Sequence, residues 1–193
     1  MMLALIRGIR NNFIRCFKGY RFTLGILGII SVFILSLLDY KNEIRVIHVF
    51  VDSFPTITFL LAIMFCSLPY AASLYEDLEN NYYRQELARH KPGITILSKA
   101  VVIFFSAVLT MFIGSLIFTF LLGLRYEWGI LEDYGDFLLD ISDMIKNNQL
   151  VLYVAVTAYK VGTLYGVLAL LSTAISLFIR NKLIVYATPA ILW

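Results

Sequence analysis

Three acidic side chains lie close together in one short segment that also carries basic residues. Glu76, Asp77 and Glu79 fall within four positions, and Arg84 and Arg89 follow them. Neighbouring carboxylates can act as a general acid and base or hold a metal ion. On a solvated helix, however, acids and bases one to three turns apart form ion pairs, and this simpler interpretation accounts for the whole group. We therefore expect no catalytic site in this segment.

The other residues that could do chemistry are scattered along the chain. Cys16 and Cys66 lie far apart, and His48 and His90 stand alone, so neither pair has the spacing of a metal site or a disulfide framework. The sequence has no G-x-x-x-x-G-K-[ST] phosphate loop, no H-E-x-x-H and no G-x-S-x-G. A net charge of +3 without a dense basic face argues against a nucleic-acid partner. These observations predict a chain that is not an enzyme and binds no metal or cofactor itself, with an intramembrane enzyme as the alternative.

The elements that must position these residues are apolar runs of membrane length. Sixty percent of the chain is apolar and only 15% is charged, which favours lipid over water as its solvent. We expect an all-α, polytopic transmembrane bundle that forms one domain. Its predicted spans are residues 22–38, 54–74, 100–124, 150–179 and 183–193. The last run is short and stops at Trp193 without a polar flank, which predicts a chain truncated within its fifth span.

Basic residues between the predicted spans indicate the orientation. Eleven Lys and Arg residues fall before the first span, in the loop 75–99 and in the turn after the fourth span, whereas four fall in the opposite segments. The loop 125–149 on that opposite side is acidic. Because basic loops are retained on the cytoplasmic side, we expect the N-terminus and the loop 75–99 to be cytoplasmic and the loop 125–149 to be external.

An amphipathic helix is predicted over residues 3–20, before the first span. Its apolar side chains recur every three or four positions and are Leu3, Ile6, Ile9, Phe13, Phe17 and Tyr20. Such a helix would lie along the inner leaflet, with apolar side chains in the acyl boundary and arginines at lipid phosphates. The alternative is a basic flank that only sets the orientation of the first span.

The fourth predicted span carries one charge and a stripe of small residues. Lys160 lies within the apolar run, so its amine would contact an anionic group in a translocation path or, alternatively, reach the outer interface. Ala158, Gly162 and Gly166 recur every four positions, and small residues at this spacing allow close helix packing. The partner in that packing is either another span or a second protomer.

The loop 75–99 has the sequence YEDLENNYYRQELARHKPGITILSK, and its Ser98 and Lys99 open the next apolar run. This loop resembles the cytoplasmic loop of permease subunits of bacterial type-2 ABC exporters. Residues recur at helical spacing from Leu74 to Leu87, and Pro92 and Gly93 follow. This pattern predicts a short helix that projects from the membrane and ends near the Pro-Gly pair. In the family this loop contacts the ATPase subunit. The residues that the resemblance assigns to this coupling role are Glu76, Asp77, Glu79, Asn80, Tyr82, Arg84 and Arg89.

The resemblance implies a permease of the bacterial cytoplasmic membrane that exports a peptide, lipid or drug-like substrate. ATP with Mg would be bound by a separate ABC ATPase subunit on the cytoplasmic side, and the permease would pair with a second copy or a homologue. The basic helix 3–20 is similar to the family's N-terminal connecting helix. Family members have six spans, whereas this chain stops within its fifth. A substrate-binding membrane subunit of a vitamin importer, which has a similar size, is a further alternative.

Overall fold

The computed structural model describes residues 2–38, 45–52, 58–79, 92–128, 149–176, 186–188 and 191. The elements within these ranges are helical. Their bounds are α1 Met2–Lys18, α2 Tyr20–Leu38, α3 Val46–Asp52, α4 Thr58–Ser67, α5 Ser73–Glu79, α7 Pro92–Gly123 and α9 Leu150–Ser176. The predictions for residues 80–91, for 129–148 of the acidic loop and for most of 183–193 lie outside the described residues.

Three helices in the described part of the chain are long and apolar enough to cross a membrane. They are Tyr20–Leu38, Gly93–Gly123 and Leu150–Ile175. The prediction of an all-helical chain is therefore confirmed, and these helices are compatible with a membrane-embedded protein. The first of them begins two residues before the predicted span, because α1 ends at Lys18 and Gly19 alone separates it from α2.

The predicted second span, 54–74, is not one continuous helix. Within its described part, α4 ends at Ser67 after 10 residues, a turn covers residues 68–72, and α5 begins at Ser73. Pro69 accounts for the break, because its ring lacks an amide hydrogen and would clash with the carbonyl of Phe65 in a continuous helix. A hydrogen bond from another helix stabilises this turn. The Thr173 hydroxyl of α9 donates it to the Ala71 carbonyl at 3.4 Å.

The helix that carries the predicted third span, 100–124, begins eight residues before that span. Helix α7 starts at Pro92, a residue that is tolerated at the first position of a helix, and it runs for 32 residues. At 1.5 Å per residue it is about 48 Å long, against about 30 Å for the hydrocarbon core of a bilayer. Its first turns, which the sequence analysis assigned to the loop 75–99, can therefore extend beyond the hydrocarbon.

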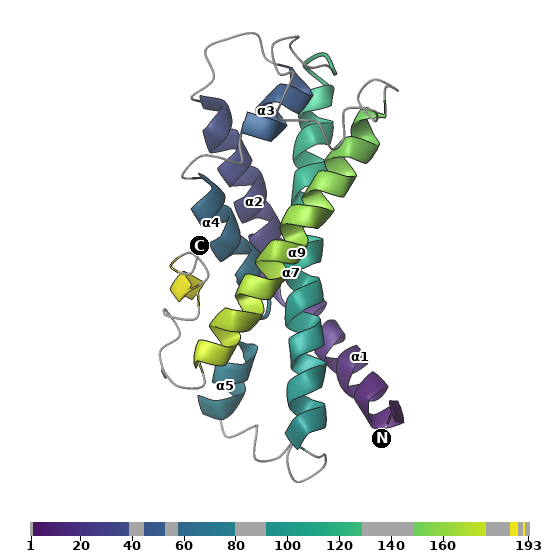
Figure 1. The fold of residues 1–193 in the computed structure, drawn as a ribbon, viewed down its shortest axis with the longest axis vertical. Helices are drawn as coiled ribbons and strands as arrows, with labels where there is room; N and C mark the ends of the chain where they lie inside the picture. Colours follow the sequence, from purple (N-terminus) through teal and green to yellow (C-terminus); the bar gives the residue numbers. More distant parts are fainter. Residues whose placement is uncertain are drawn as a thin grey trace.

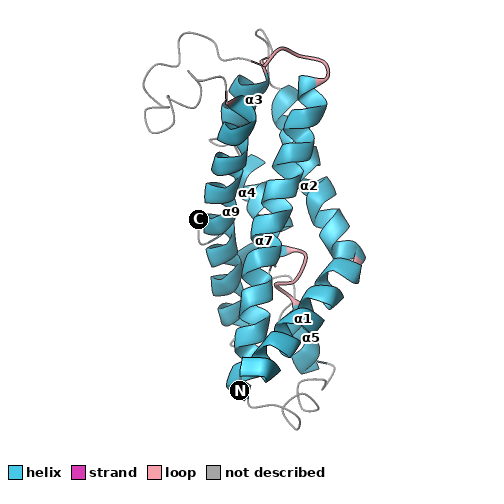
Figure 2. Cartoon of the chain, turned by 90° about the vertical axis from the view of Figure 1, so that its right-hand side faces the viewer, coloured by secondary structure: helices cyan, strands magenta, loops and turns pink. Residues whose placement is uncertain are grey.

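Helix α7 lies at the centre of the described bundle. It packs against α1, α2, α3, α4 and α9, and α9 crosses it near the middle of both helices (Figure 1). Helix α1 leaves the bundle at an angle beside the first turns of α7 (Figure 2). We call this the α1 end of the molecule, where α5 also lies, and we call the opposite end, where α3 lies, the α3 end.

The helices approach closely at glycine residues, which have no side chain. A Cβ atom at Gly28 of α2 would lie 2.1 Å from a ring carbon of Phe65, and one at Gly25 would lie 3.1 Å from the Phe65 carbonyl oxygen. Towards the α3 end, the rings of Phe33 and Phe118 stack with their centroids 4.9 Å apart. The buried core thus continues along α2, α4 and α7.

Candidate functional site

Asp77 is the centre of a charge cluster at the α1 end. Its side chain is only 2% exposed, and Arg15 of α1 contacts both carboxylate oxygens, with Nη2 2.8 Å from Oδ1 and Nη1 3.1 Å from Oδ2. The ammonium of Lys99, on α7, also contacts Oδ2, and its side chain is 1% exposed. Two cations from two helices therefore compensate one buried carboxylate, which stabilises a charge that would otherwise be costly in the interior.

Glu76 forms a second ion pair beside the first. Arg21 contacts both of its carboxylate oxygens, with Nη2 2.7 Å from Oε1 and Nη1 2.8 Å from Oε2. Arg15 belongs to α1 and Arg21 to α2, so the two arginines lie on either side of the corner at Gly19. The two adjacent acids of α5 thereby bind both helices of that corner. We call Arg15, Arg21, Glu76, Asp77 and Lys99 the charge node.

Uncharged hydrogen bonds join the same helices next to the charge node. Asn12 of α1 donates through Nδ2 to the Ser98 hydroxyl at 3.1 Å, and it accepts at Oδ1 from the Tyr70 hydroxyl at 2.8 Å. A Cβ atom at Gly8 would lie 3.3 Å from Ser98, so α1 and α7 are close together here. Since Asn12, Tyr70 and Ser98 are all buried, these bonds fix how α1 lies on α7.

The charge node attaches α5 to three other helices, α1, α2 and α7. Both acids are engaged by guanidinium or ammonium groups, so they lack the free carboxylate that a general base requires. Within the described ranges, no group of three His, Cys, Asp or Glu side chains could hold a metal ion. Removing one partner from a buried pair is strongly destabilising, so a movement of α5 must carry the attached helices with it or break this pairing.

The other residues predicted for the coupling role are placed only in part. Glu79 is exposed at the last position of α5. Four residues lie outside the described part of the chain: Asn80, Tyr82, Arg84 and Arg89. Helical spacing predicts that these acids pair with arginines of the same segment. The partners that the structure gives to Glu76 and Asp77 come instead from α1, α2 and α7.

Six residues of this site were not predicted to be functional. They are Asn12, Arg15, Arg21, Tyr70, Ser98 and Lys99, of which Ser98 and Lys99 were noted only as the start of an apolar run. One signal was available, because an acid and a lysine that directly flank apolar runs must be paired or solvated. The partner of each could not be found by spacing, since Arg15 and Asp77 are separated by 62 positions.

Lys160 is exposed, on the side of α9 opposite the helix face that packs on α7. The hydroxyl of Thr163 donates to its backbone carbonyl at 2.6 Å. No ion pair joins its amine to another described side chain. The residue therefore lies on the outer surface of this chain, and a role in a translocation path stays a prediction.

The small-residue stripe of α9 packs against α7 of the same chain. Ala158 is fully buried, and a Cβ atom at Gly162 would lie 3.2 Å from both the Cα atom and the carbonyl oxygen of Val108. One at Gly166 would lie 2.7 Å from the ring of Phe104. Of the two partners considered for this stripe, the structure thus places another helix of the chain against it.

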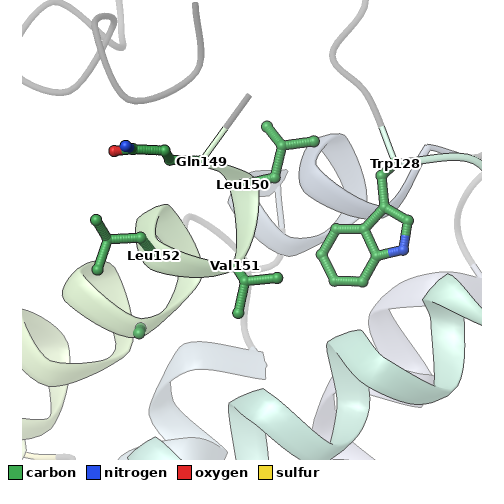
Figure 3. Close-up of a pocket in the computed structure, with 6 residues that line it drawn as sticks. Trp128, Gln149, Leu150, Val151 and Leu152 are labelled. Carbon is green, nitrogen blue, oxygen red and sulfur yellow. The ribbon is translucent and has the colours of Figure 1, made fainter. Parts of the chain in front are cut away.

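A hollow at the α3 end is lined mainly by apolar side chains. It lies between Trp128 and the start of α9, and its lining is Trp128, Gln149, Leu150, Val151, Leu152 and Ala155 (Figure 3). Gln149 contributes the only side-chain amide among these residues. None of these six described residues is an acid, a base or a nucleophile.

Comparisons of the chain with models of known protein families, with curated proteins and with solved structures found no match. We therefore give the family of this chain only as a proposal. The charge node, with the acidic helix α5 that it holds, is the arrangement on which we base that proposal.

Cys16 provides a test of the packing of α1. Its side chain is buried against the bundle, and this burial raises the pKa of the thiol from its usual 9.0 to about 11, while a hydrogen bond with Ser106 acts in the opposite direction. In a Cys66→Ser protein, we expect maleimide to label folded Cys16 at pH 7 at least about a hundredfold more slowly than the unfolded chain, because only the thiolate reacts.

Burial of this thiol also makes the stability of the protein depend on pH, with a definite sign. The folded thiol binds its proton more tightly than the unfolded thiol, so its contribution to stability is complete below pH 9.0 and is lost as the pH rises towards about 11. Rapid labelling of the folded protein at pH 7 would show that α1 does not pack as described.

Proposed function

We propose that this chain is the membrane-spanning permease subunit of an ATP-driven ABC transporter of the type-2 exporter class. It would export a peptide, lipid or drug-like substrate with energy from a separate ATPase subunit, and it would act together with a second copy or a homologue. The N-terminus would be cytoplasmic, in a bacterial cytoplasmic membrane. The resemblance of residues 75–99 to the family's coupling loop is the starting point.

One structural observation supports this proposal above all others. Helix α5, which carries the first residues of the loop 75–99, is ion-paired to α1, α2 and α7 at once. Two of these helices, α2 and α7, are of membrane length. A partner that pulled on residues 80–91 would therefore act on two spans through short, charge-assisted contacts, which are the stronger class of hydrogen bond.

The distribution of charge agrees with this orientation. Helix α1 carries Arg7, Arg10, Arg15 and Lys18 without an acid, and it lies at the same end as α5 and the start of α7. Basic segments on one side of a bundle favour the cytoplasmic side. A motor protein in the cytosol would thus reach α5 and the segment that follows it.

The proposal predicts a stable complex with an ATPase that depends on residues 79–89. The tagged chain would be purified in detergent from its native host, and the captured proteins would be identified by mass spectrometry and tested for ATP hydrolysis. We expect a soluble ATPase with a G-x-x-x-x-G-K-[ST] loop to be recovered, and its recovery to fall at least about tenfold when residues 79–89 are scrambled.

The scrambled segment begins at Glu79 so that the ion pairs of Glu76 and Asp77 stay intact. An Arg125→Gln variant, changed in an exposed residue at the α3 end, serves as the matched control and should keep the ATPase. The proposal is wrong if no such ATPase is recovered, or if the scrambled chain folds and retains it fully.

A further inference from the structure

An arginine lies in the middle of an exposed apolar stripe on α1. The stripe consists of Leu3, Ile6, Ile14 and Phe17, which are 81%, 51%, 46% and 41% exposed. Arg10 is four positions from Ile6 and from Ile14, and seven from Leu3 and from Phe17. At 3.6 residues per turn these spacings place all five side chains on one face of the helix.

This face is turned away from the rest of the chain. Helix α1 packs on α7 through the side that carries Gly8, Asn12 and Cys16, all spaced by four positions. Arg10 is two positions from Asn12, which at about 100° per residue is on nearly the opposite side of the helix. The hydrogen bonds of Asn12 fix this rotation, so the stripe cannot turn inward while they persist.

The charge of this face is not compensated within the described ranges. Arg15 is bound to Asp77, but the exposed Arg7 and Arg10 form no ion pair with the other residues described. Helix α1 contains no acid. Arg7 is one turn from Arg10, so the two guanidinium groups can reach the same anion.

We propose that Arg7 and Arg10 bind the phosphate of an anionic phospholipid at the surface of the membrane that holds this protein. Leu3, Ile6, Ile14 and Phe17 enter the acyl boundary around that headgroup. A guanidinium fork matches the geometry of a phosphate, and its alkyl stem can lie along apolar surface while the charged head reaches the headgroup layer.

Several features favour a lipid over a protein partner at this face. The stripe is continuous with the apolar surface of the bundle, because Tyr20 and Leu24 at the start of α2 are also exposed. Cations beside an exposed apolar stripe are the arrangement by which helices bind anionic membrane surfaces. This inference requires only that the chain lies in a bilayer, so it does not depend on the proposed transport function.

The test compares lipids that differ only in charge. The full chain would be placed in nanodiscs of equimolar phosphatidylglycerol and phosphatidylcholine, and the lipids that stay bound after release would be counted by native mass spectrometry. Two basic residues near an anionic surface predict a phosphatidylglycerol preference of about thirtyfold. Arg7→Gln with Arg10→Gln should bring the ratio close to one.

Two variants serve as controls. Arg125→Gln removes an exposed arginine at the α3 end and should leave the preference unchanged. Arg15→Gln weakens the charge node, so it should lower the unfolding temperature while the lipid preference persists. These two results separate lipid binding from stability and from total charge.

Three outcomes would overturn the proposal. The first is equal retention of both lipids by the unchanged protein. The second is a phosphatidylglycerol preference that survives the double substitution. The third is a dimer that persists without lipid and dissociates on the same substitution, which would assign the face to a second copy of the chain.

Discussion

Asp77→Ala is expected to lower the free energy of unfolding by about 3–5 kcal/mol, the usual cost of removing one partner from a buried ion pair. The loss is large because the substitution leaves Lys99 buried, with its side chain 1% exposed, without the carboxylate that it contacts. Arg15 loses the same partner but is half exposed, so water can solvate its guanidinium group. Most of the cost therefore comes from Lys99.

The measurement is denaturant unfolding of the purified chain in detergent micelles, and Glu79→Ala is the matched control. Glu79 is on the same short helix and is exposed, so its removal should change stability by less than about 0.5 kcal/mol. Replacing both partners, as Asp77→Leu with Lys99→Met, should recover much of the loss because no buried charge is left alone. A similar small effect for Asp77→Ala and Glu79→Ala would contradict the charge node.

The helices that the sequence predicts well are those whose limits are set by local residues. The amphipathic helix expected over 3–20 is observed as Met2–Lys18, and the span expected over 22–38 is observed as Tyr20–Leu38. In both, an abrupt change of polarity or a glycine marks the boundary. The break within the span expected over 54–74 was not predicted, because the apolar composition is uniform across Pro69 and hydropathy alone does not register a missing amide hydrogen.

The charge node could not be predicted for a different reason. Spacing relates residues that are three or four positions apart, so it led us to pair the acids of α5 with Arg84 and Arg89. The contacts observed for Asp77 join positions 22 and 62 residues apart, and they exist only because α1 and α7 meet beside α5. The sequence did indicate that charges next to apolar runs need partners, but only the fold supplies the partners.

The small-residue stripe of α9 shows the same division between pattern and partner. Its spacing predicts close helix packing, and the structure assigns α7 as the helix that it contacts. At Gly162 the nearest atoms are backbone atoms of Val108, which cannot move aside as a flexible side chain can. An added side chain at this position must therefore push the two helices apart.

Gly162→Leu is expected to lower the free energy of unfolding by about 3 kcal/mol or more, at the upper end of the range for overpacked sites. Even the first added carbon would lie 3.2 Å from the Val108 backbone, so α9 must move away from α7 and lose contacts along the stripe. Gly162→Ala should give a smaller loss in the same direction, because only that first carbon is added.

Gly93→Ala is the control that separates packing from helix propensity. It is also a helical glycine, but a Cβ atom there would have no heavy atom within 4 Å. In such a position alanine restricts the unfolded chain without a clash, so we expect a stabilisation of about 0.4–1 kcal/mol. The same chemical change should thus stabilise the protein on the exposed first turn of α7 and destabilise it at the contact with Val108. If both substitutions stabilised the protein, close contact between α7 and α9 would not be what holds these two membrane-length helices together.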